Sequence, residues 1–180
     1  MNKNLISHPA INSFKNSSEK YCKLIEGINS YSPYEIFQEC AKIFPILYSE
    51  ALALPEIEIK GDKDEVDEID HEKWNLIYLN ISNIFGKYNL YTDVHDPIHP
   101  DKDEPTMASL ADDLSDIYRD LKNGLLKLNN NYNSKIESVV WDWKFNFQTH
   151  WGIHLASALK AIHFLIFDHM EKDYKNQNAG

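Results

Sequence analysis

Apolar residues recur every three to four positions along most of the chain, which is the period of an amphipathic α-helix. A further apolar stretch runs from about residue 134 to 171 and forms one helix or two, because only Gly152 interrupts it. The fold expected is all-α, a mainly antiparallel bundle of about five helices with a long central C-terminal helix. The pattern predicts the earlier helices over about residues 12–28, 33–54, 71–85 and 109–128.

Two helix starts carry the sequence of a capping box, in which a serine and a glutamate three positions later satisfy each other's backbone amides. Ser32 and Glu35 form the first, with Pro33 at the first helical position. Ser134 and Glu137 form the second, directly after the asparagine-rich stretch 129–134, which predicts a turn.

The segments between the predicted helices are polar. Residues 56–70 are acidic and are interpreted as a solvated connection, and residues 86–108 hold three prolines without a helical period. A connection as long as 86–108 is often functional or mobile, and whether it forms a lid is left open. We expect residues 1–180 to form a single helical domain with frayed ends at 1–11 and 172–180.

The formal net charge is −10, from 18 basic and 28 acidic residues. This balance excludes a nucleic-acid-binding role and favours cations or another, basic, protein as partners. No run reaches the roughly 18 apolar residues of a membrane span, so no membrane association and a cytoplasmic location are expected. Cys22 and Cys40 lack a CxxC spacing and are predicted to be reduced, structural thiols.

The stretch ADDLSDIYRDLK, residues 111–122, carries four aspartates on an amphipathic helix. The helical period places Asp113, Asp116 and Asp120 together on one flank of the apolar stripe, while Asp112, Asp116 and Arg119 share the back. One interpretation is a solubilising face. However, like charges three or four positions apart repel, so this flank needs a cation, an arginine or a hydrogen-bond donor from elsewhere.

Arg119 is the only arginine beside 17 lysines. Its retention is either chance or the mark of a site that needs a planar, bidentate donor, which lysine cannot supply. Within its own helix, Arg119 can pair with Asp112 or Asp116.

A second stretch, FQTHWGIH at residues 147–154, places His150 and His154 one helical turn apart, a spacing used for zinc, iron or nickel. The surrounding helix is apolar on all sides, so both imidazoles are expected to be buried. The glutamate of the HExxH protease motif is absent.

Together the two stretches predict one cluster in the core of the bundle. With a divalent metal, which is a candidate cofactor, the ligands would come from Asp113, Asp116, Asp120, His150 and His154. Without a metal, the same groups would form a buried histidine–aspartate network that orients the helices.

The segments SLADDLSDIYRDLKNGL (109–125) and VVWDWKFNFQTHWGIHLASALKAIH (139–163) resemble an uncharacterised bacterial, all-helical family known only as a domain of unknown function. The resemblance implies no activity. It implies that the family's characteristic positions, which are the candidate binding residues, are Asp112, Asp113, Asp116, Arg119, Asp120, His150, Trp151 and His154.

Two classes of function follow. The first is a small acidic helical binding or protein-interaction module, for example an immunity or inhibitor protein for a basic partner. The alternative is a metal-dependent hydrolase or phosphate-handling enzyme that uses the aspartate and histidine cluster, with Arg119 placed for an anionic group.

Overall fold

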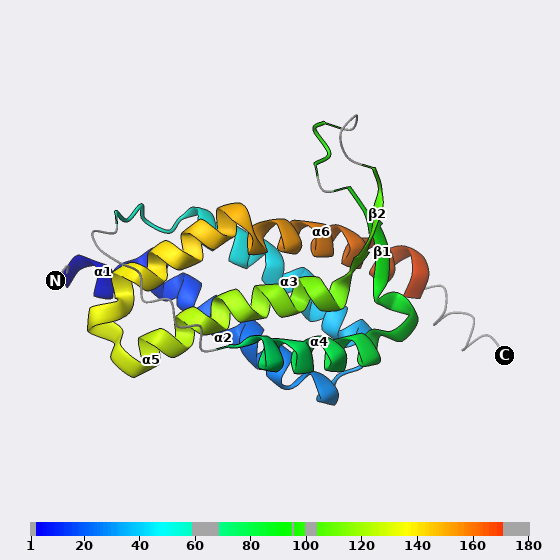
Figure 1. Cartoon of the computed structure of the whole chain (residues 1–180), viewed down its shortest axis with the longest axis horizontal. Coiled ribbons are helices and arrows are strands. Elements are labelled where there is room, and N and C mark those ends of the chain that lie inside the picture. The colour runs from blue at the N-terminus through cyan, green and yellow to red at the C-terminus, as the bar shows by residue number, and fades with distance from the viewer. Residues whose placement is uncertain (1–2, 59–68, 95, 100–103, 171–180) are drawn as a thin grey trace.

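The computed structural model describes residues 3–58, 69–94, 96–99 and 104–170, without the side chains of residues 130–135 (Figure 1). The described chain is mainly helical, as predicted. Its elements in order are α1 (Lys3–Ile6), α2 (Pro9–Glu26), η1 (Ile28–Ser30), α3 (Pro33–Leu52), α4 (His71–Phe85), η2 (Gly86–Tyr88), β1 (Leu90–Asp93), β2 (Thr106–Ser109), α5 (Leu110–Thr149), α6 (Trp151–Phe164) and the π-helical η3 (Leu165–Met170).

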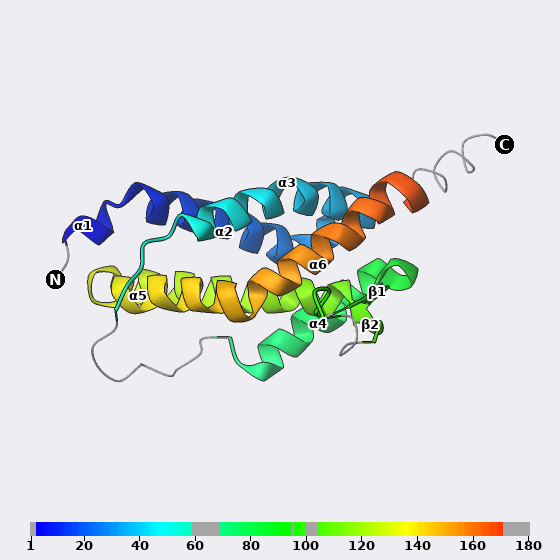
Figure 2. The same cartoon turned by 90° about the horizontal axis from the view of Figure 1, so that it is seen from above.

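The helices pack in layers around α5. Figure 2 shows α2 and α3 side by side on one side of α5 and α4 on the other. Helix α6 packs on both α5 and α3. None of the helices in the described ranges is both long and apolar enough to cross a lipid bilayer.

The long helix α5 turns back on itself. Trp143 Nε1 donates a hydrogen bond to the carbonyl oxygen of Leu121 at 3.3 Å, and Lys127 pairs with Asp142 at 3.5 Å. Residues 121 and 143 would lie roughly 33 Å apart in a straight helix. The chain therefore forms two antiparallel arms, a first arm before the 129–134 stretch and a second arm after it.

The chain reverses around the stretch 129–134, where a turn was predicted. The prediction of a separate helix after that turn is not met, because α5 is helical from Leu110 to Thr149. The Ser134 side chain of the second capping box lies outside the described residues. The first capping box is confirmed, since Ser32 and Glu35 make both reciprocal hydrogen bonds at the start of α3.

The C-terminal apolar stretch contains two helices, because the backbone breaks at His150 (φ −144°, ψ −90°) rather than at Gly152. The prediction that the C-terminal helix is buried on all sides is wrong. Helix α6 buries Trp151, Leu155, Ala158 and Ile162 against the bundle and leaves Ile153 41% exposed. Phe164 is also 52% exposed, so part of the apolar surface of α6 faces solvent.

A small antiparallel sheet, which the sequence did not predict, is formed by residues 90–93 and 106–109. Leu90 pairs with Ser109 and Asp93 with Thr106. Asn89 joins the sheet to α5, because its side-chain oxygen accepts a hydrogen bond from the amide of Ala111 at 2.9 Å. The hairpin stands at the end of the bundle where α6 ends (Figure 1).

The hydrophobic core follows the predicted stripe of α5's first arm, where every member is at most 5% exposed: Leu110, Leu114, Ile117, Leu121 and Leu125. Cys22 and Cys40 are free and buried, as expected for structural thiols. Residues 3–11, where fraying was expected, include α1 and the start of α2, and Ile11 is fully buried.

Candidate metal centre

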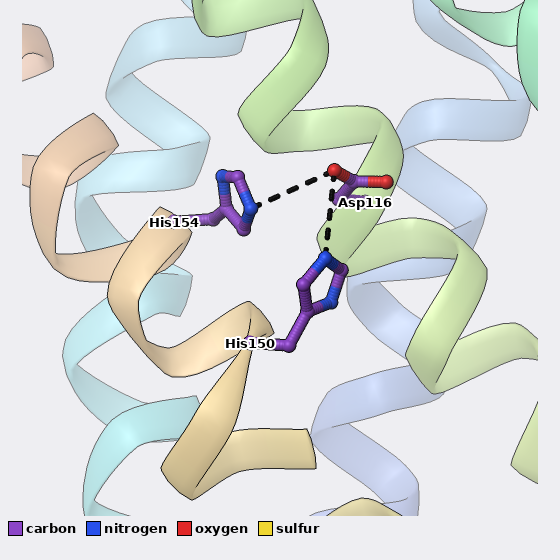
Figure 3. A group of neighbouring side chains, drawn as sticks. All are labelled: Asp116, His150 and His154. Carbon is purple, nitrogen blue, oxygen red and sulfur yellow. Dashed lines mark ion pairs between the residues drawn. The ribbon is translucent and has the colours of Figure 1, made fainter.

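Three donor atoms from two neighbouring helices converge beside the break between α5 and α6. Nε2 of His150 lies 3.7 Å from Oδ2 of Asp116, and Nε2 of His154 lies 3.6 Å from the same oxygen (Figure 3). One ligand atom from each of the three residues lies within 4.8 Å of the others. Asp116 comes from the first arm of α5, His150 from the break, and His154 from α6.

Helical spacing explains why these groups share one place. Asp113, Asp116 and Asp120 lie on the flank of α5 that faces α6, as the period predicted, and the two histidines lie one turn apart. His150 and His154 are in edge-to-face contact, with ring centroids 4.9 Å apart. Antiparallel packing of the α5–α6 segment on the first arm brings both imidazoles to the aspartates.

The other nitrogen of each imidazole is bound to a carboxylate. Nδ1 of His150 lies 2.8 Å from Oδ2 of Asp120, and Nδ1 of His154 lies 2.8 Å from Oδ1 of Asp113. An ionised carboxylate only accepts hydrogen bonds, so each Nδ1 carries the proton. In a neutral imidazole this leaves the Nε2 lone pair free, and both lone pairs are directed towards Asp116.

The other oxygen of Asp116 is held by the single arginine. Nη2 of Arg119 lies 2.7 Å from Oδ1 of Asp116, an ion pair without the angles of a hydrogen bond. The guanidinium carbon lies 5.8 Å from the centroid of the Trp74 ring on α4, within the range of a cation–π contact. The pairing predicted within the helix is therefore made with Asp116.

Tyr91 on β1 adds an outer contact that the sequence analysis missed. Its hydroxyl donates a hydrogen bond to Oδ2 of Asp113 at 2.7 Å, so both oxygens of Asp113 are engaged. Burial and the nearby charge of Asp113 raise the pKa of Tyr91, which keeps the hydroxyl protonated as a donor. The contact could have been predicted only if the sequence around residue 91 had indicated a β-hairpin.

The environment shifts the pKa of several groups in the cluster. Burial raises the pKa of Asp113, against the hydrogen bonds from His154 and Tyr91, which lower it. Burial also raises the pKa of Asp112, followed by the charge of Asp116. Burial alone would lower the pKa of His154, but the hydrogen bond and charge of Asp113 raise it on balance.

Most of the residues predicted for this site do lie together. Asp113, Asp116, Asp120, His150 and His154 form the contacts above, Arg119 pairs with Asp116, and Asp112 is close enough for its pKa to respond to Asp116 and His154. The prediction of buried histidines is wrong, because the side chains of His150 and His154 are 36% and 26% exposed. The site lies at the solvent edge of the α5–α6 contact.

Trp151 is not part of the cluster. Its side chain is fully buried, and Nε1 donates a hydrogen bond to the carbonyl oxygen of Trp143 at 3.1 Å. The ring packs on Phe14 and Phe147 in the core. Trp151 follows His150 in the sequence, but α6 buries the side that carries Trp151 and turns the adjacent side, with His154, towards the site.

The distances between the three groups are compatible with a metal ion bound among them. Contacts of 3.6 and 3.7 Å are too long for hydrogen bonds, and neither Nε2 atom has another hydrogen-bond partner in the described part of the chain. Two donors bound to one zinc ion at about 2.1 Å each lie at most about 4.2 Å apart. The two distances to Oδ2 of Asp116, 3.6 and 3.7 Å, fit that limit.

The comparisons with known proteins identify the family. A family model described as a domain of unknown function, DUF5063, matches residues 6–168. This chain belongs to the DUF5063 family. The resemblance to an uncharacterised family that the motifs indicated is thereby confirmed.

The fold of this DUF5063 protein is also found in a solved structure. This chain is similar to the crystal structure of protein BF1032 from Bacteroides fragilis, with a TM-score of 0.79 and 21% sequence identity. The match covers 91% of this chain and 96% of that chain. This likeness supports the fold. No curated protein matches the chain, so the function has to be argued from the site.

Proposed function

We propose that this DUF5063 protein binds one divalent transition-metal ion through Oδ2 of Asp116 and the Nε2 atoms of His150 and His154. The observation that carries the proposal is that each donor residue is held at its other polar atom. Asp120 and Asp113 bind the two Nδ1 atoms, and Arg119 pairs with Oδ1 of Asp116. Outer partners of this kind orient the ligands in metal proteins. A network with only a structural role does not require three ligand atoms to converge on one point.

The charge of the cluster favours a cation over an anionic ligand. Asp112, Asp113, Asp116 and Asp120 oppose the single guanidinium of Arg119, which leaves three formal negative charges if the imidazoles are neutral. Carboxylates this close repel one another in a partly buried site. A divalent ion would relieve most of that repulsion, so metal binding supplies the cation that the acidic flank of α5 requires.

The donor set fits zinc or ferrous iron, which accept imidazole together with carboxylate ligands. Two histidines and one carboxylate leave coordination positions open, and the partial exposure of both imidazoles gives solvent access to them. A bound zinc ion would supply a water whose pKa is lowered to about 7. Metal-assisted hydrolysis, one of the alternatives that the sequence raised, is therefore the reaction class proposed.

The residues of the chain have separate parts in this proposal. Asp113 and Asp120 hold the proton on each Nδ1 and so present both Nε2 lone pairs to the ion. Arg119 restrains the carboxylate of Asp116, and Tyr91 restrains that of Asp113. The role of a protein-interaction module stays a prediction that rests on the net charge of −10.

Metal content and affinity test the proposal. The purified protein, and the chelator-treated protein titrated with Zn²⁺ in a calorimeter, should both reach about one equivalent. The variants H150A, H154A and D116N should each weaken zinc binding by at least about a hundredfold, since each loses one of three ligands. H163A is the matched control, because His163 is an exposed histidine on the same helix.

Two results would overturn the proposal. One is less than about a tenth of an equivalent of zinc together with an unchanged melting temperature in excess Zn²⁺ or Fe²⁺. The other is equal zinc affinity in H163A and H154A when circular dichroism shows both folded. Substitution with Co²⁺ tests the open position separately, because added azide should change the visible absorption of the bound cobalt only if a coordination position is free.

A further inference from the structure

Of the four aspartates beside the proposed metal centre, only Asp112 is not engaged by another side chain. Asp113 and Asp120 are bound to imidazole nitrogens, and Asp116 pairs with Arg119. Within the part of the chain that the structure describes, the carboxylate of Asp112 makes neither a hydrogen bond nor an ion pair. An ionised carboxylate is an acceptor only, so the oxygens of Asp112 are available to a hydrogen-bond donor from outside the protein.

Asp112 lies beside ligands that come from two helices. It precedes Asp116 by one turn of α5, and residues at this spacing have Cβ atoms about 5–6 Å apart. Burial has the largest effect on the pKa of Asp112, and the charges of Asp116 and of His154 on α6 follow. Both ligands therefore act electrostatically on Asp112, which places its carboxylate at the border of the proposed metal centre.

Asp112 is nevertheless not a ligand. Among the described residues, the ligand atoms within 4.8 Å of one another belong to Asp116, His150 and His154. Zinc holds an oxygen ligand at about 2.1 Å, and a water donates a hydrogen bond over about 2.7 Å. A carboxylate that accepts a hydrogen bond from a water on the ion therefore lies up to about 5 Å from the ion. A free carboxylate outside the ligand set suits contact with such a water.

The edge of the site admits both the water and a substrate. The side chains of His150 and His154 are 36% and 26% exposed, and Asp112 is itself only partly buried, unlike Asp116. A divalent ion would neutralise two of the three formal negative charges of the cluster. The remaining charge repels an anionic substrate, so a neutral carboxylic ester is the better match.

We propose that Asp112 is the general base of the reaction, the group that accepts the proton of the attacking water. The inference rests on the metal-assisted hydrolysis proposed above. One O–H bond of the water breaks and its proton moves to an oxygen of Asp112, while the water oxygen forms a bond to the carbonyl carbon of the ester. The bond from that carbon to the leaving oxygen then breaks, and the leaving oxygen takes the proton back from Asp112.

Hydrolysis of p-nitrophenyl acetate by the whole protein tests the role, with the rate in excess chelator subtracted from the rate with zinc. D112N should lower the zinc-dependent kcat/KM by at least about a hundredfold, because it removes the proton acceptor. E72Q is the matched control, since Glu72 is an exposed carboxylate in the first turn of α4. Calorimetry should give D112N the zinc affinity of the wild type, because Asp112 is not a ligand.

Two further variants separate proton transfer from a structural role. D112E keeps a carboxylate and should retain more activity than D112N. D112A should gain zinc-dependent activity when formate is added, because a small carboxylate in solution can take the place of the missing base. Circular dichroism of D112N and D112A shows whether both variants are folded.

Each possible failure has its own meaning. Equal zinc-dependent kcat/KM in D112N and E72Q would overturn the role of Asp112, as would a D112A variant that formate does not activate. Zinc affinity in D112N as weak as in H154A would also overturn it, because Asp112 would then be a ligand. Absence of zinc binding in the wild type would instead refute the metal centre. Zinc binding without zinc-dependent hydrolysis would refute the proposed reaction and, with it, the role of Asp112.

Discussion

Replacement of Gly124 by alanine is the sharpest test of how the two arms of α5 fit together. A Cβ atom at this position would lie 2.2 Å from Nε1 and 2.4 Å from Cε2 of Trp143. An ordinary contact begins at 3.4 Å, so the arms must separate by more than 1 Å or Trp143 must leave its place. Trp143 is 1% exposed and donates a hydrogen bond to Leu121, so neither change is easy.

The magnitude follows from three contributions. Overpacking of a core costs about 1–3 kcal/mol. Loss of the hydrogen bond of Trp143 adds about 1 kcal/mol. The better helix propensity of alanine offsets about 1 kcal/mol. A net loss of about 1–3 kcal/mol in the free energy of unfolding is expected, which lowers Tm by roughly 2–12 °C for a chain of this size.

Urea unfolding followed by circular dichroism measures this loss, and G27A is the matched control. The nearest atom to a Cβ at Gly27 would be the carbonyl oxygen of Lys23 at 3.3 Å, a contact that needs only a small shift. G124A should also weaken zinc binding, because Asp120 and His150 hold the same two arms together. Equal stability of G124A and the wild type would refute the close packing of Gly124 on Trp143.

Three further predictions follow from single contacts. D120N should weaken zinc binding about 10–100-fold without removing a ligand, because Asp120 fixes the orientation of His150. Y21F should cost about 1 kcal/mol in urea unfolding, since the buried hydroxyl of Tyr21 donates to the carbonyl oxygen of Leu114 at 2.8 Å. S32A should cost about 0.5–2 kcal/mol and should change the pH dependence. The backbone amide and hydroxyl of Ser32 hold the pKa of Glu35 below its ordinary value, so this stabilisation is present above the unfolded pKa and is lost as the pH falls through the folded pKa.

Each of these has an outcome that contradicts it. Zinc affinity in D120N equal to that of the wild type would remove the positioning role of Asp120. An unchanged free energy of unfolding in Y21F would mean that the hydrogen bond to Leu114 contributes nothing net. Identical stability profiles of S32A and the wild type between pH 3 and pH 6 would contradict the capping box as the cause of the shift in Glu35.

Local patterns were sufficient to predict much of the fold. Helix α4 has the bounds predicted, His71–Phe85, because its period ends at a glycine, and Gly86 has the positive φ of 50° that favours this residue. The burial of Leu114 and Leu121 and the single flank of Asp113, Asp116 and Asp120 follow from the helical period alone. These features depend on residues within two or three turns of one another.

Features that depend on contacts between distant segments were not predictable. Helix α6 was expected to be the central helix. Which of its apolar sides is covered depends on the neighbouring helices, and Ile153 faces solvent. Gly152 indicated an interruption of the C-terminal helix, but not that the backbone breaks two residues earlier, at His150. The contact of Tyr91 with Asp113 requires the β1–β2 pairing, and the two short strands lack a recognisable alternation of apolar and polar residues.

Because the two arms of α5 are antiparallel, the proposed metal would cross-link segments that are far apart in the chain and so stabilise the folded state. The metal would join Asp116 to His150 and His154, which lie 34 and 38 positions further along the chain. A cross-link that closes a loop of this length removes roughly 4 kcal/mol of conformational entropy from the unfolded chain in the loop-closure model. Amide hydrogen exchange in both arms should therefore slow together when zinc is added, because opening either arm releases the ion.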